Sequence, residues 1–173
     1  MNCGIYDSKN QYSILFYIQI AENMDGENIK LKAVDVDLSI IPINGIYIKR
    51  LICENKYVEI DKEENKIHID ELYQGTSIYV VIEIDETKHY DNIIAFDDTR
   101  LVVDLNYFDV EENMNINKIL DSTITSHNNE YYETLINEIK RGNRPRIKPC
   151  SNTLHLCDSD SDSSDDYEIL EGV

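Results

Sequence analysis

The sequence predicts a mainly β protein, an antiparallel β-sandwich followed by one or two C-terminal helices and a disordered acidic tail. Its 173 residues include 26 Ile against six Gly, three Pro and no Trp, a composition rich in β-branched strand formers. Apolar and polar residues alternate through several short segments before residue 110. Turn residues separate these segments at close spacing, which is typical of a sandwich.

We expect three regions along the chain. The β-sandwich occupies residues 1–112, a helical segment occupies residues 113–142, and a disordered tail, first basic and then acidic, occupies residues 143–173. A single domain of this length is long enough to bury a hydrophobic core.

The first apolar segment is "SILFYIQIA", residues 13–21, and it fits either a core strand or a short buried helix, of which the strand is favoured. A signal peptide is not expected, because no basic region precedes the segment and no small-residue cleavage site follows it. The segment is also too short to span a bilayer, so no membrane association is expected.

A second strand is predicted over residues 34–40 by strict alternation. The side chains expected to share one face are Val34, Val36, Leu38 and Ile40. The apolar residues just before them alternate in the opposite phase, so a bulge or break near Ala33 is expected. A turn at Asn44 and Gly45 then leads into a strand that opens with Ile46 and Ile48.

Four more strands are expected before residue 110. Two weaker ones, at residues 57–60 and 66–69, flank the charged turn "DKEEN", and "YQG" forms the turn before the strong strand "TSIYVVIEID". The last strong strand is "RLVVDLNYF". The inward-facing side chains are expected to be Ile78, Val80, Ile82 and Ile84 in the first strong strand, and Leu101, Val103, Leu105 and Tyr107 in the last.

After residue 109 the apolar period changes from two to that of a helix. The segments "NINKILDSTI" and "NEYYETLINEIKRG" carry apolar residues at helical spacing, and Gly142 sits where a left-handed C-cap residue would be. These one or two helices are expected to pack against the sandwich or against a partner.

The strand order over residues 34–109 resembles the β-sandwich region that follows the von Willebrand factor type A domain in many intracellular and bacterial proteins. The matching segments are "DVDLSIIPINGIYIKR", "IHIDELYQGTSIYVVIEID" and "LVVDLNYFD", which cover somewhat less than half of the chain. The metal-binding motif of the preceding domain in that family, Asp-x-Ser-x-Ser, does not occur here. The resemblance therefore implies an accessory sandwich with a scaffold or docking role, without the family's Mg²⁺ site.

The chain is strongly acidic, with a formal net charge of −18. Seven acidic residues lie between Asp158 and Glu171, so the residues before them carry −11. No nucleic-acid partner is expected, because binding to the phosphate backbone needs clustered Lys and Arg. Basic protein partners are compatible with this charge, and solubility alone would also explain it.

The cysteines indicate a reducing, cytoplasmic location. The four are widely scattered and show no dense disulfide framework. The absence of an Asn-x-Ser/Thr sequon among 17 Asn residues also argues weakly against secretion. Cys150, His155 and Cys157 offer three soft ligands, but a structural zinc site needs a fourth, here from the distant Cys3 or Cys53. Free thiols are the favoured reading, so no metal or cofactor is expected.

No catalytic residue is expected. The four His residues, His68, His89, His127 and His155, lie far apart with no nucleophile pattern beside them, and no phosphate loop, nucleophile elbow or zinc-protease helix is found. His68 falls on the outward phase of a strand and is expected to be a surface residue. The clustered carboxylates before residue 70 are expected on solvated strand faces and turns, and they are Asp35, Asp37, Asp61, Glu63 and Glu64.

The acidic tail "SDSDSSDDYEIL" is the clearest candidate for function. A calcium loop starting at Asp160 fails, because Asp165 stands where the loop needs Gly and no exit helix follows. Four serines stand among Asp residues, the context that acidophilic kinases of the casein kinase II type prefer. The candidate phosphorylation sites are Ser159, Ser161, Ser163 and Ser164.

The end of the tail, "DDYEIL", resembles the LIR-type docking peptide of autophagy receptors. The docking residues are then Asp165, Asp166, Tyr167, Ile169 and Leu170. The resemblance implies that the peptide adds a strand to a ubiquitin-like modifier, with Tyr167 and Leu170 in two pockets and the acids against basic residues. The same residues also fit a Tyr-x-x-Φ sorting signal.

Taken together, these features predict a non-catalytic, soluble protein-interaction module with an acidic docking tail. The alternative is a charge-based binder or decoy of basic proteins, similar to a histone chaperone. Pocket docking predicts dependence on Tyr167, whereas binding by charge alone predicts steep salt sensitivity and indifference to Tyr167. An enzyme ranks third, and a cleft with convergent titratable groups would favour it.

Overall fold

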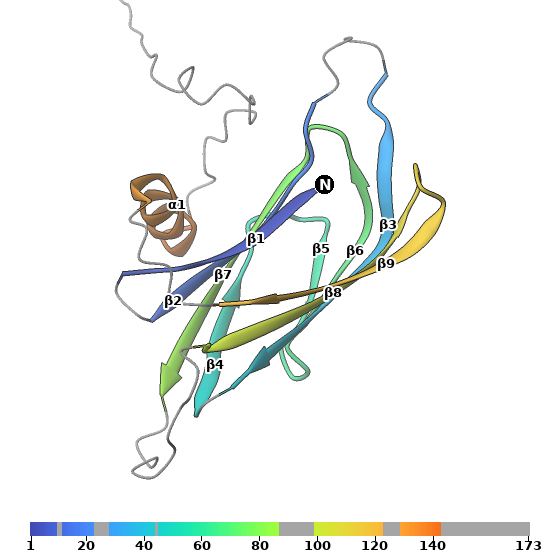
Figure 1. The fold of residues 1–173 in the computed structure, drawn as a ribbon. Helices are drawn as coiled ribbons and strands as arrows, with labels where there is room; N and C mark the ends of the chain where they lie inside the picture. Colours follow the sequence, from blue (N-terminus) through green and yellow to red (C-terminus); the bar gives the residue numbers. More distant parts are fainter. Residues whose placement is uncertain (10–11, 23–27, 44, 87–98, 123–128, 143–173) are drawn as a thin grey trace, which may run out of the picture.

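The computed structural model describes residues 1–9, 12–22, 28–43, 45–86, 99–122 and 129–142. Over these residues the chain is mainly β and forms two antiparallel sheets with one helix, as predicted (Figure 1). The tail expected at residues 143–173 lies outside the described residues.

The two sheets, which we call sheet A and sheet B, draw their strands from different parts of the chain. Sheet A has the order β1 (Asn2–Asp7), β2 (Ser13–Gln19), β7 (Ser77–Glu86), β4 (Ile46–Ile52). Sheet B has the order β5 (Val58–Asp61), β6 (Lys66–Tyr73), β3 (Leu31–Pro42), β8 (Leu101–Asp109), β9 (Met114–Asp121).

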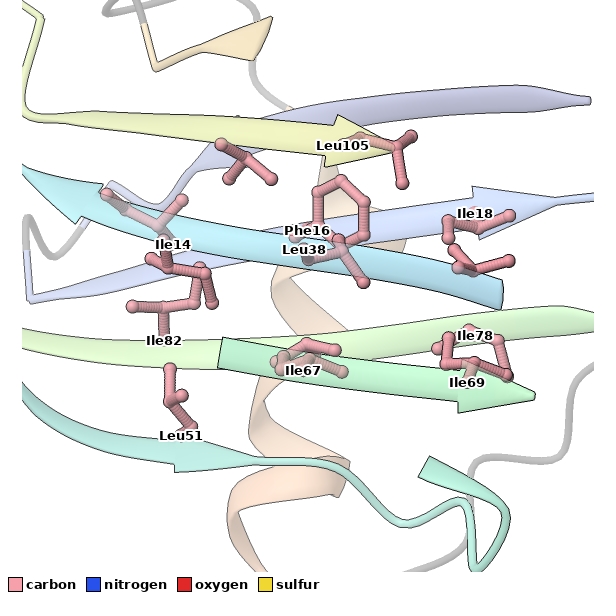
Figure 2. Close-up of a cluster of buried hydrophobic side chains, with 14 of the residues drawn as sticks. Ile14, Phe16, Ile18, Leu38, Leu51, Ile67, Ile69, Ile78, Ile82 and Leu105 are labelled. Atoms are coloured by element: carbon pink, nitrogen blue, oxygen red, sulfur yellow. The ribbon is translucent and has the colours of Figure 1, made fainter. Parts of the chain in front are cut away.

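The main hydrophobic core lies between the sheets, where side chains from both inner faces meet (Figure 2). The inward faces predicted for the two strong strands are confirmed, since all eight side chains are buried there. Residues 13–19 form strand β2 rather than a helix. Its Phe16 faces the main core while Leu15 is buried on the opposite face, which explains the nearly continuous apolar run.

The predicted irregularity near Ala33 is confirmed. The pairing of β3 with β6 shifts between Leu31 and Ala33, and its pairing with β8 shifts between Val34 and Asp37. Asp35 has φ of 50°, a left-handed conformation that Asp tolerates better than most residues. The break brings Ala33 into the core and leaves Val34 half-buried, so Val34 does not join the buried face predicted for it.

The helix predicted around "NINKILDSTI" is wrong, because residues 114–121 form strand β9 and extend the sandwich beyond residue 112. This strand pairs with β8 along its whole length without a register shift. Ile116 and Leu120 pack on the core, while Ile119, which a helix would have placed beside them, is 69% exposed. The spacing of the apolar residues in this segment fits either a helix or a strand, and pairing with the long strand β8 makes it a strand.

Helix α1 (Glu130–Lys140) covers the outer face of sheet A. It begins at Asn129, whose side chain accepts hydrogen bonds from the backbone of Tyr131 and Tyr132, and Gly142 follows its end with φ of 75°, as predicted. The helix and the sheet form a second apolar cluster of Tyr6, Leu15, Tyr79, Val81, Leu135, Ile136 and Ile139.

Polar contacts fix both ends of α1 to the sheet. The Glu133 carboxylate accepts hydrogen bonds from the Tyr6 hydroxyl at 2.8 Å, the Ser8 hydroxyl at 2.9 Å and the Lys9 backbone N–H at 2.8 Å. About two turns further along the helix, Lys140 Nζ donates to Ser13 Oγ at 2.9 Å and lies 3.3 Å from Glu83 Oε1. These contacts define where the helix docks.

Tyrosine rings join α1 to the first two strands. The Tyr132 ring stacks on the Tyr17 ring with centroids 5.1 Å apart, and it lies 5.2 Å from the Tyr6 ring. Tyr17 in turn lies over Gly4, where an added Cβ would come within 2.4 Å of the Tyr17 hydroxyl oxygen. Gly4 is therefore needed for the close approach that lets Tyr17 reach the helix.

In the described residues, no helix combines the length and the apolar character needed to cross a membrane.

Candidate functional site

The outer face of sheet B is the main surface that α1 leaves uncovered, since the helix contacts only sheet A strands closely. The register aligns one polar side chain from each of its five strands in a row: Glu59, His68, Asp37, Asn106 and Asn117. The adjacent row is Asp61, Lys66, Ser39, Asp104 and Ile119. Side chains that are far apart in sequence thus form one continuous surface, which is polar except at Ile119.

His68 lies in the first row between two carboxylates. Its Nδ1 is 2.7 Å from Asp37 Oδ1 on the neighbouring strand, and its Nε2 is 3.0 Å from Asp70 Oδ1 on the same face of β6. The hydrogen bond with Asp37 is the main reason why the His68 pKa is raised; partial burial lowers it, and Asp70 raises it further. When the ring is protonated, both of its nitrogens donate to these oxygens, so the two carboxylates hold the imidazole in one orientation.

An amide and carboxylate network occupies the β8 and β9 side of the same face. Asn117 Nδ2 lies 2.6 Å from Asp104 Oδ1 and 2.8 Å from Asn106 Oδ1, and Asn106 Nδ2 lies 3.2 Å from Asp104 Oδ1. The network holds these side chains in place across two strands, which lowers the entropy that a partner would have to remove on binding.

Two hollows border the edge strand β5. The first, of about 920 Å³, extends over β3, β6 and β5, and its polar lining includes Asp37, Ser39, Glu59, Asp61, Lys66 and His68. The second, of about 650 Å³, is lined by Tyr57, Glu59, Asp70, Glu71 and Tyr73 around buried Ile69, Leu72 and Ile78. Glu59 lines both hollows, and we call the first one the β5 groove.

The carboxylates expected on turns and solvated faces are found there. Asp61 Oδ1 accepts from the backbone N–H of Glu63 at 2.9 Å and of Glu64 at 3.1 Å, which fixes the hairpin between β5 and β6. Lys66 forms an ion pair with Glu64 beside it. Asp37 is exposed on the outer face of sheet B.

Cys3 and Cys53 are free thiols in the structure, and burial raises the pKa of Cys53. No cluster of three or more His, Cys, Asp or Glu side chains suited to a metal ion occurs in the part of the chain that the structure describes. The proposed partners of a zinc site, Cys150, His155 and Cys157, lie outside that part, and so do His89 and His127.

The predicted tail residues also lie outside the described part of the chain. They are the docking residues Asp165, Asp166, Tyr167, Ile169 and Leu170 and the phosphorylation candidates Ser159, Ser161, Ser163 and Ser164. The tail therefore stays a prediction from sequence.

His68 was expected on the surface, and that is confirmed, but its two carboxylate partners were missed. Half of the signal was present in "HID", because His68 and Asp70 must share a face at period two. The partnership with Asp37 depended on the register between β3 and β6, which alternation within one strand does not determine.

Comparison with known proteins finds no matching family model, no similar curated protein and no similar solved structure. Two resemblances therefore stay predictions from sequence. One is that of residues 34–109 to the sandwich that follows von Willebrand factor type A domains, and the other is that of the tail to LIR-type peptides.

Proposed function

We propose that this chain is a non-catalytic protein-interaction module whose sandwich presents the outer face of sheet B to partners. The observation that carries the proposal is the row of polar side chains across five strands on a face that α1 does not cover. Prearranged hydrogen-bonding groups spread over an open face of five strands favour recognition of another protein over enclosure of a small substrate.

The state of His68 supports a binding role over catalysis. General base catalysis needs a ring nitrogen free to take a proton, whereas both nitrogens of His68 face carboxylates. The charge distribution also supports binding, because the carboxylates are spread across a surface instead of converging on one reacting position.

The acidic tail is a second binding element in this proposal, supported by its sequence. Tyr167 and Leu170 would fill pockets on a ubiquitin-like modifier, with Asp165 and Asp166 against basic residues and phosphoserines adding charge. The alternative of charge-based binding to basic proteins is supported by the net charge of −18. Free Cys3 and Cys53 support work in a reducing compartment such as the cytoplasm.

Quantitative capture on the immobilised full chain tests the face. The variant Asn117→Lys with Ile119→Lys places two cations on exposed positions of β9. Its matched control, Thr134→Lys with Asn137→Lys, places the same charges on exposed positions of α1. We expect partners of the face to be lost only from the β9 variant.

The tail is tested in the same experiment with Tyr167→Ala plus Leu170→Ala. Loss of a distinct set of partners at physiological salt supports docking through the tail. Partners that leave with rising salt but ignore the tail substitutions would support binding by charge alone. If every captured protein were retained equally by all variants, the interaction proposal would be wrong.

A further inference from the structure

We propose that the β5 groove binds an extended, lysine-rich segment of a partner protein. This inference rests on the proposed function, because it assigns a partner chemistry to the same face of sheet B. It is carried by three features of the described residues: the charge of the face, the hollow over it, and the spacing of the carboxylates along β5.

The outward positions of sheet B are strongly acidic. Lys66 and His68 stand among them and Lys62 of the β5–β6 hairpin also lines the β5 groove, but Lys66 is already paired with Glu64. The outward carboxylates are Asp37, Glu59, Asp61, Asp70, Asp104 and Asp121. A cationic partner is therefore complementary to the face, and an anionic or nucleic-acid partner is repelled.

The shape of the face favours an elongated ligand. The β5 groove has a volume of about 920 Å³ and is lined by β5, β6 and β3. Strand β6, which contains buried Ile67, is the middle strand of the three. The walls of the groove come from β3 on one side and from β5 and its hairpin on the other. A segment in extended conformation fits such a trough, whereas a helix about 10 Å wide would not settle between side chains on adjacent strands.

The spacing of carboxylates along β5 matches alternate residues of an extended chain. Glu59 and Asp61 lie two residues apart, face the same side and are both exposed. Side chains two apart in any extended strand are separated by about 6.6 Å. A partner with Lys at alternate positions would present its ammonium groups at the same interval, and each would meet one carboxylate.

The test measures fluorescence anisotropy of two labelled synthetic hexapeptides of equal composition, Lys-Thr-Lys-Thr-Lys-Thr and Lys-Lys-Lys-Thr-Thr-Thr, against the full chain. The groove variant is Glu59→Gln with Asp61→Asn, in which the new amide oxygen at position 61 can still accept the hairpin hydrogen bonds. The matched control is Glu112→Gln with Glu130→Gln, which removes two exposed carboxylates from the β8–β9 turn and from α1. Thermal unfolding verifies that both variants are folded.

We expect the alternating peptide to bind at least about threefold tighter than the blocked peptide. The groove variant should weaken that binding by about three- to tenfold, the effect of losing two exposed charge pairs, and the control by less than twofold.

Equal binding of both peptides together with equal losses in both variants would overturn the groove inference and leave charge-based interaction standing. Failure of the wild-type chain to bind either peptide at low salt would also overturn it. In that case the interaction proposal would still be decided separately by the capture experiment with the β9 and tail variants.

Discussion

At the scale of single residues, the ion pair between Asp7 and Arg100 places two charged side chains in a largely buried position. Arg100 Nη1 lies 2.8 Å and 3.1 Å from the two carboxylate oxygens, and the side chains are only 12% and 5% exposed. Burial raises the pKa of Asp7, although Arg100 pulls it down. The pair ties β1 to the start of β8 and so links the two sheets.

We predict that Asp7→Ala destabilises the fold by about 3–5 kcal/mol, because it removes the buried carboxylate that the Arg100 guanidinium contacts. Equilibrium urea unfolding measures the loss. The double variant Asp7→Leu with Arg100→Met should be less destabilised than Asp7→Ala, since no buried charge is left. The explanation would be contradicted if the stability lost by the double variant equalled the sum of the losses measured for Asp7→Leu alone and for Arg100→Met alone.

His68 gives a prediction for the pH dependence of stability. Its pKa is raised in the folded state, so the stabilisation is complete below the unfolded value near 6.5 and is lost as pH rises through the folded pKa. The side chain is 35% exposed, which limits the effect to about 0.5 kcal/mol. Between pH 6 and 9, the wild type should lose this much relative to His68→Gln in urea unfolding. Parallel pH profiles of the two chains would rule out the contribution.

At the scale of elements, the docking of α1 depends on one partly buried hydrogen-bond acceptor, Glu133, as well as on the apolar side of the helix. Burial raises the pKa of Glu133, but hydrogen bonds from the Lys9 N–H, Tyr6 and Ser8 outweigh it and leave the pKa lowered. The carboxylate therefore stabilises the fold above its unfolded pKa, and this stabilisation is lost as pH falls through the folded pKa.

We predict that Glu133→Ala costs about 1–3 kcal/mol, because the Tyr6 and Ser8 hydroxyls and the Lys9 N–H lose this acceptor together. The control is Glu130→Ala in the same helical turn, at an exposed position, which should cost less than about 1 kcal/mol. Chemical unfolding followed by circular dichroism compares them. Equal costs would mean that Glu133 acts only through the helix dipole.

The elements also show what sequence could and could not predict. The strong strands β7 and β8 were predicted with their inward faces, and β3 with its inward face apart from Val34, because sustained alternation of apolar and polar residues indicates a half-buried strand. Strand β1 was not anticipated, because Asn2–Asp7 is short and contains Gly4, and its role depends on Tyr17 covering that glycine. Strand β9 was taken for a helix, and only its pairing with β8 decides between the two.

The same limit applies to the candidate site. Which side chains face outward on β6 followed from its own alternation, but the row from Glu59 to Asn117 exists only through four strand registers. Registers are set by turns and by packing across the sheet, which a single strand sequence does not contain.

At the scale of the whole molecule, the two sheets have unlike surroundings. Sheet A has the main core on one face and α1 on part of the other, where Tyr47 of β4 stays exposed, whereas the outer face of sheet B is mostly polar. In the part of the chain that the structure describes, the main core is formed by the strands, and the helix contact extends to Ile139.

We therefore predict that the chain truncated after Gly142 keeps the fold. Its free energy of unfolding should match that of the full chain within about 0.5 kcal/mol, as measured by urea unfolding at moderate salt. The comparison at low salt serves as a control, since removal of the acidic tail changes long-range repulsion there. A truncated chain that unfolds without cooperativity would show that the tail contributes to the fold.

The stacked tyrosines between α1 and sheet A have one practical consequence. The chain has 12 Tyr, three Phe and no Trp, so tyrosine dominates its near-ultraviolet circular dichroism and intrinsic fluorescence. Tyr132 is the ring that touches both Tyr6 and Tyr17, and these contacts exist only while the helix is docked. The molecule therefore carries its own optical reporter of helix docking, readable without a label and separable from unfolding of the sheets by far-ultraviolet signals.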